Sequence, residues 1–174
     1  MKKAQHEIVG FVIIVVLVTV IGLIFLLLTF GNEEVGRQTS VEVSNLLLSS
    51  MYYTTDCAIS KVPQYKDIQD LVKECYYHES RNCLNEVSVC NVLENDLRSL
   101  ISNSLVVHED AVNKAYKVHI YYSPRDEEIE DEPIRSFEEG NFTGCKTIIA
   151  GDHAIPTKPF GSGNIKVDLF VCKN

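Results

Sequence analysis

The chain has 174 residues, which is enough for one domain with a core of its own. Its 24 acidic and 16 basic residues give a formal net charge of −8, and this balance argues against a nucleic-acid-binding protein. There is no Gly-rich phosphate loop and no dinucleotide-binding motif, so neither a cofactor nor a small-molecule substrate is predicted.

An apolar run over residues 8–30 contains no charged residue and no proline. At about 1.5 Å per residue, a helix of this length reaches roughly 34 Å, which is enough to cross a hydrocarbon core of about 30 Å. A water-soluble core helix would carry a polar stripe, and none is present. A cleaved secretory signal would have a shorter apolar region that ends in small residues. The run therefore predicts a single transmembrane helix.

The residues on either side of this helix predict its orientation. Lys2 and Lys3 precede it and two glutamates follow it, and the basic flank of a membrane helix stays in the cytoplasm. We therefore expect residues 1–7 to be a cytoplasmic leader and the C-terminal part to lie outside the cell. Six cysteines fit an oxidising compartment. Asn141 begins an Asn-Phe-Thr glycosylation sequon, which also fits an outside location.

The sequence Lys-Lys-Ala-Gln-His-Glu, residues 2–7, directly precedes the apolar run. It resembles the leader of archaeal type IV pilins and archaellins, in which a membrane peptidase removes a short basic leader before the apolar helix. The resemblance covers residues 2–30 and implies cleavage between Ala4 and Gln5. It also implies that Glu7 assists filament assembly, although the family usually places this Glu at the fifth mature position and Glu7 would be third. The helix would then contact membrane lipid before assembly, and copies of itself or other pilin-like subunits afterwards.

Residues 31–56 are expected to form a joint and a helical stalk, and residues 57–174 an extracytoplasmic domain. In the stalk, the apolar residues Val43, Leu47 and Met51 recur at helical spacing, and Thr39 or Ser40 is the expected N-cap.

Two further helices are expected at the start of the domain. Ile68, Leu71 and Cys75 share the face of an amphipathic helix. Asn91 and Glu94 form a capping pair for the next helix, which should reach about residue 103.

After these helices the apolar period changes from 3.6 to 2, which predicts strands over residues 116–122, 145–150 and 165–172. Residues 105–108 are the expected hairpin partner of the first strand. The acidic segment 126–139 is expected to be a solvated loop, since it lacks the ligand spacing of an EF-hand calcium site. Helices followed by strands predict an α+β domain with a C-terminal antiparallel sheet.

The cysteines predict three disulfides that staple this domain. Antiparallel pairing of the last two predicted strands places Cys145 opposite Cys172, so we expect these two to be bridged. The remaining four are expected to be bridged among themselves in an order that the sequence leaves open: Cys57, Cys75, Cys83 and Cys90. A zinc site formed by three of these thiols and His78 is the alternative, although the spacing matches no common zinc motif.

A hydrolase is a further alternative, since Asp152, His153 and Ser162 are residue types used in catalysis. The Gly-x-Ser-x-Gly elbow is absent, so no enzyme is predicted. The sequence instead predicts a single-pass glycoprotein of the cell membrane or of a cell-surface filament. Its expected role is that of a type IV pilin-like structural subunit of a filament or pseudopilus. The alternative is a non-filamentous, membrane-anchored binding or adhesion module, for which the same N-terminus is an ordinary signal-anchor.

Overall fold

The computed structural model describes residues 12, 14–25, 38–60, 64–108, 111–126, 128–157 and 163–174. The chain divides into two compact units, Met1–Gly36 and Arg37–Asn174. In the first unit, residues 12 and 14–25 are helical. No helix in the described part of the chain is both long and apolar enough to cross a membrane. The rest of the predicted span lies outside the described residues, as do Ala4, Gln5 and Glu7.

The second unit is an α+β domain built on a five-stranded sheet of order β1-β6-β7-β4-β5. Its strands are β1 Gln38–Thr39, β4 Asn113–Pro124, β5 Glu132–Gly140, β6 Thr147–Pro156 and β7 Gly163–Lys173. Neighbouring strands are antiparallel, except that β1 runs parallel to β6. The predicted α+β class and the C-terminal antiparallel sheet are therefore confirmed.

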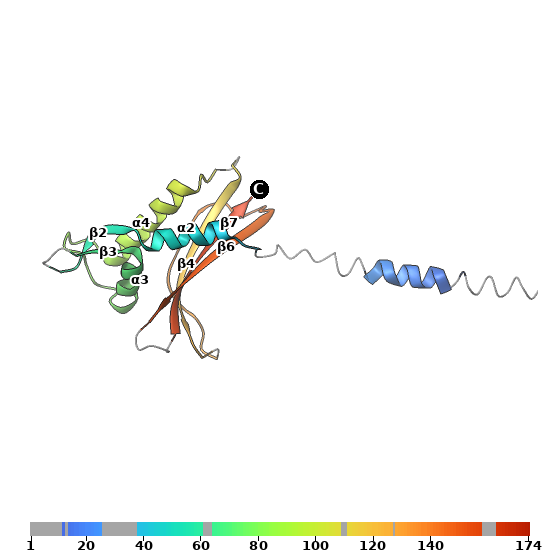
Figure 1. The fold of residues 1–174 in the computed structure, drawn as a ribbon, viewed down its shortest axis with the longest axis horizontal. Helices are drawn as coiled ribbons and strands as arrows, with labels where there is room; N and C mark the ends of the chain where they lie inside the picture. The colour runs from blue at the N-terminus through green and yellow to red at the C-terminus, as the bar shows by residue number, and fades with distance from the viewer. Residues whose placement is uncertain are drawn as a thin grey trace, which may run out of the picture. The chain divides into compact units, whose positions relative to one another are not determined.

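The helices of this domain are α2 Val41–Met51, α3 Ile68–Tyr77 and α4 Val89–Ser104. Helices α2 and α4 lie on one face of the sheet, and α3 packs against α4 (Figure 1). A small antiparallel pair, β2 Thr54–Ala58 and β3 Tyr65–Asp67, connects α2 to α3. Asp67 caps α3, because its carboxylate accepts a hydrogen bond of 2.7 Å from the amide of Asp70.

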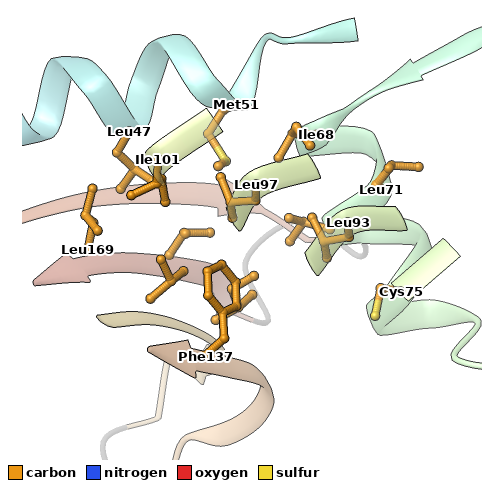
Figure 2. Packing of buried hydrophobic residues seen from close by; sticks show 14 of the residues in the cluster. Leu47, Met51, Ile68, Leu71, Cys75, Leu93, Leu97, Ile101, Phe137 and Leu169 are labelled. Atoms are coloured by element: carbon orange, nitrogen blue, oxygen red, sulfur yellow. The ribbon is translucent and has the colours of Figure 1, made fainter. Parts of the chain in front are cut away.

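The core lies between these helices and the inner face of the sheet. Alternate residues of β4 and β7 point inward and are fully buried, as the period of two predicts: Tyr116, Val118, Ile120, Ile165, Val167, Leu169 and Val171. Figure 2 shows Leu47 of α2, Ile101 of α4 and Leu169 of β7 in one apolar cluster. Each fully buried leucine or isoleucine contributes about 1.5–3 kcal/mol relative to exposure, so the domain has a core of its own.

The domain begins earlier than the sequence predicted, because α2 belongs to it. Val43, Leu47 and Met51 are buried under the helix, so the described part of the predicted stalk 31–56 is not a separate element. The compact unit starts at Arg37, whereas the predicted domain started at Cys57. The apolar side chains along one face of α2 are stable only when they are buried from water, and packing against the sheet buries them.

Helix α4 also begins before its predicted cap. The helix starts at Val89, with Ser88 at the N-cap position, so the Asn91–Glu94 capping pair was wrong. The backbone explains the difference, since the carbonyl of Ser88 accepts the amide of Val92 at 3.0 Å. Glu94 is instead paired with Arg98 at 3.2 Å along the helix surface.

The predicted acidic loop 126–139 is in part a strand. β5 covers residues 132–140, pairs with β4 along one edge only and places Phe137 in the core. Charged residues are common on edge strands because they discourage pairing with other chains. A charged edge strand therefore lacks the apolar pattern from which a strand is predicted, and its sequence resembles that of a loop. Residues 105–108 do not form the predicted hairpin partner of β4, and Val107 makes a single bridge to Asn113.

Candidate functional site

Every cysteine lies in a disulfide, and the pairs are Cys57–Cys83, Cys75–Cys90 and Cys145–Cys172. The third pair is the one expected from the strand arrangement. Its register differs, however: Cys172 lies opposite Ile148, and Cys145 reaches it from the turn before β6. The first two bridges use the thiols that the zinc alternative requires, and no metal-binding cluster is found in the described part of the chain.

The described helix of the first unit exposes apolar side chains all around. Val12 is 53 % exposed and Phe25 is 66 % exposed, and the helical residues between them are exposed as well wherever they are described. The hydroxyl of Thr19 turns back to the helix, 2.8 Å from the carbonyl oxygen of Val16. A helix that is apolar on every side has no face suited to water, so this surface is a candidate for contact with lipid or with other apolar helices.

The end of the domain at which the chain arrives from the first unit is a second candidate surface, named here the attachment end. β1 lies parallel to β6, with Thr39 beside Ala150, so the chain arrives next to the first residues of β6. The last residue of β7, Lys173, pairs with Thr147 of β6 and with Asn113 of β4. The start of α2, the start of β4 and the ends of α4 and β7 therefore meet at the attachment end.

A cavity of about 410 Å³ lies at the attachment end. Its walls come from α2, the end of α4, β4, β6 and β7, and the lining residues are Glu42, Val43, Leu46, Ser104, Leu105, Val112, Asn113, Ile149, Val171 and Lys173. Six of the ten lining residues are aliphatic, whereas Glu42 and Lys173 are the charged members of this lining. The cavity therefore suits an apolar group more than a highly charged one.

A polar cluster of Ser102, Tyr116 and Glu139 ties α4 to the two strands β4 and β5. The Tyr116 hydroxyl lies 2.8 Å from the Ser102 hydroxyl, and both hydroxyls donate to the Glu139 carboxylate at 2.8 Å. These two bonds lower the pKa of Glu139 below its usual value of 4.5. Burial of the ring raises the pKa of Tyr116 above 10.0, so its hydroxyl stays protonated and remains a donor.

Replacing Tyr116 with Phe is expected to lower the free energy of unfolding by about 1 kcal/mol at neutral pH, because Ser102 and Glu139 each lose the tyrosine hydroxyl as a hydrogen-bond partner. Chemical denaturation followed by circular dichroism measures this change. Lys117→Gln on the opposite face of β4 is the matched control and should change the unfolding energy by much less. An equal loss in both variants would show that the cluster does not stabilise the domain.

The pH dependence of this cluster has a definite sign. The lowered pKa of Glu139 means that its stabilising effect is present above about pH 4.5 and is lost as the pH falls through the folded-state pKa. The stability difference between wild type and Glu139→Gln should therefore shrink towards zero in acid. Glu138→Gln is the control on the same strand, since Glu138 faces Lys117 across the strand pair. A stability difference between wild type and Glu139→Gln that stays constant from neutral pH into acid would contradict the lowered pKa of Glu139.

Asp152 and His153, the residues of the hydrolase alternative, lie within β6 and point to opposite faces of the sheet. The Nε2 atom of His153 is 3.3 Å from the Oε1 atom of Gln69 in α3. Burial lowers the pKa of His153, and the negative charge of Asp152 opposes this shift only in part. The contact with Gln69 joins β6 to α3, and Ser162 lies outside the described residues.

The predicted glycosylation residue, Asn141, lies in the turn after β5 and is exposed. Its Oδ1 atom accepts a hydrogen bond of 2.8 Å from the amide of Thr143, the hydroxyl residue of the sequon. The position is thus open to a glycan on the surface of the domain.

Sequence reasoning missed the attachment end. The exposed valines Val41, Val106 and Val112 that mark it are far apart in the sequence, and no local pattern separates them from core valines. Comparison of the chain with protein-family models, with curated proteins and with solved structures found no match.

Proposed function

We propose that the chain is a type IV pilin-like structural subunit, anchored in the cell membrane by its N-terminal apolar helix and assembled through that helix into a cell-surface filament or pseudopilus. One observation carries the proposal: the described helical residues of the first unit are uncharged, apolar except for Thr19 and exposed on every side, in a chain whose second unit has a core of its own. Such a helix needs an apolar environment, which lipid supplies before assembly and neighbouring helices supply in a filament.

The domain supports this role in two ways. Three disulfides link distant parts of the chain, as is typical of domains in oxidising compartments outside the cytoplasm. The lining of its cavity is mainly aliphatic, which suits contact with an apolar group. The basic residues Lys2 and Lys3 before the apolar run favour an orientation with the domain outside.

The test is intact-mass measurement and N-terminal sequencing of the protein from native membranes, without reductant, together with electron microscopy of the surface fraction. We expect a chain that starts at Gln5, is two hydrogens lighter for each disulfide and forms protein-only filaments. Glu7→Gln should remain in the membrane and lose filament assembly, whereas Gln38→Glu in β1 should assemble normally. A chain that keeps Lys2 and Lys3 and forms no filaments would refute the pilin-like role and favour the anchored binding module.

A further inference from the structure

We propose that the attachment end of the domain is a lipid-binding surface that lies on the phosphate headgroups of the membrane when the subunit is anchored there. This inference rests on the proposed anchoring by the N-terminal helix, and goes beyond it by assigning a membrane-contacting face to the domain itself. The face consists of exposed valines, three lysines and the cavity beneath them.

Exposed aliphatic side chains gather at this end. Val41, Val106 and Val112 are 76 %, 72 % and 68 % exposed, more than any other large apolar side chain in the described part of the domain. Val41 opens α2 immediately after β1, and Val106 follows the end of α4. Val112 precedes β4, and its carbonyl accepts the amide of the C-terminal Asn174 at 2.9 Å. Three solvated valines on one end of a domain are costly in water, and burial in the interfacial layer of a bilayer removes that cost.

Lysines flank these valines on the neighbouring strand ends. Lys114 is the second residue of β4, Lys146 precedes β6 and Lys173 ends β7. The amide of Lys146 donates to the carbonyl of Lys173 at 3.1 Å, which fixes these two residues side by side. Within the described residues none of the three lysines forms an ion pair. A lysine ammonium group is attracted to the phosphate groups of a membrane.

A cluster of exposed acidic residues lies at the other end of the sheet, whereas Glu42 is the acid in the cavity lining of the attachment end. Pro124, at the far end of β4, pairs with Gly163. The exposed acids that follow it in the described chain are Asp126, Glu128, Glu130, Asp131 and Glu132. β4 has 12 residues, so its ends are about 40 Å apart at roughly 3.3 Å per residue. This distance is several Debye lengths at physiological salt, so an anionic membrane attracts the attachment end and repels the acidic end.

The cavity extends the attachment end into the interior of the domain. Val112 belongs both to the exposed valines and to the cavity lining, and Leu46, Leu105 and Ile149 continue the aliphatic lining inward. Lys173 and Glu42 are the charged residues of the same lining, next to the apolar walls. An acyl chain with a phosphate headgroup has the matching chemistry, with an apolar part for the walls and a negative charge for the lysine.

The chain contains no tryptophan, so the fluorescence of a single introduced tryptophan reports on one chosen position. Val112→Trp places one fluorophore at the attachment end, and Ile129→Trp places one at the acidic end, where the native side chain is 58 % exposed. The full chain of each variant is reconstituted into liposomes of phosphatidylcholine and phosphatidylglycerol with brominated acyl chains, which quench tryptophan by contact. An interfacial side chain enters a bilayer by about 5–10 Å, so Val112→Trp should lose roughly half of its emission. Ile129→Trp should lose almost none.

Further variants separate the contribution of the valines from that of the lysines. The fluorescence of Val106→Trp should be quenched as much as that of Val112→Trp. This second variant keeps the test valid if Val112→Trp does not fold. Changing Lys114, Lys146 and Lys173 to Gln should reduce the quenching of Val112→Trp in anionic liposomes, but not in liposomes of phosphatidylcholine alone. Equal quenching at Val112→Trp and Ile129→Trp in chains that co-float with the liposomes would overturn the lipid-binding surface and leave the anchor intact. Failure of the wild-type chain to co-float would overturn both proposals.

Discussion

Replacing Gly151 with alanine is expected to lower the free energy of unfolding of the domain by about 3 kcal/mol, at the upper end of the range for overpacking. A Cβ atom at this position would lie 2.6 Å from the backbone nitrogen of Ser44 and 2.8 Å from its Cα atom. These atoms belong to helix α2 and cannot rotate away, so the helix would have to lift from β6. Leu47 and Met51, which α2 buries in the core, would then lose packing.

Chemical denaturation of the full chain in detergent, followed by circular dichroism, measures this loss. Ala154→Val is the matched control, because Ala154 is exposed on the same strand and a β-branched side chain is well accepted there. The control adds more volume than Gly151→Ala and should leave the midpoint almost unchanged. Equal midpoints for Gly151→Ala and wild type would show that α2 does not lie against β6 at this position.

Removing the Cys75–Cys90 disulfide by a double change to alanine is expected to cost about 3 kcal/mol, the chain-entropy value for a 15-residue loop. The bridge joins α3 to α4, and its residues are buried in the core. For a domain of this size the loss corresponds to a fall of roughly 10 °C in Tm. Differential scanning calorimetry of the oxidised proteins measures it.

The Cys145–Cys172 bridge supplies the comparison for this prediction. Its sequence separation is 27, and loop-closure entropy grows only with the logarithm of loop length, so its removal should cost a similar amount. A wild-type Tm that is unaffected by a thiol reductant, but that falls on addition of a chelator, would contradict the disulfide and support the zinc alternative.

The sequence by itself determined the features that depend on local periodicity and on composition. The helix over Ile68–Tyr77 and the strand that ends near Cys172 follow from spacings of 3.6 and 2, because burial of one face imposes these periods on the sequence. The Cys145–Cys172 pair followed from the antiparallel order of the last two predicted strands, even though the register differs from the expected one. The pilin-like role, the leader cleavage and the membrane span remain proposals, with residues 1–11 outside the described chain.

Only the tertiary structure decided which residues meet across distant segments. β5 escaped prediction because an edge strand with one partner tolerates charges on its open side, and only pairing with β4 makes it a strand. Gly151 reads as a turn residue in the sequence, and its importance comes from the close approach of α2. The same holds for Val41, Val106 and Val112: their exposure and their common location are set by where separate strands and helices end, which no local pattern records.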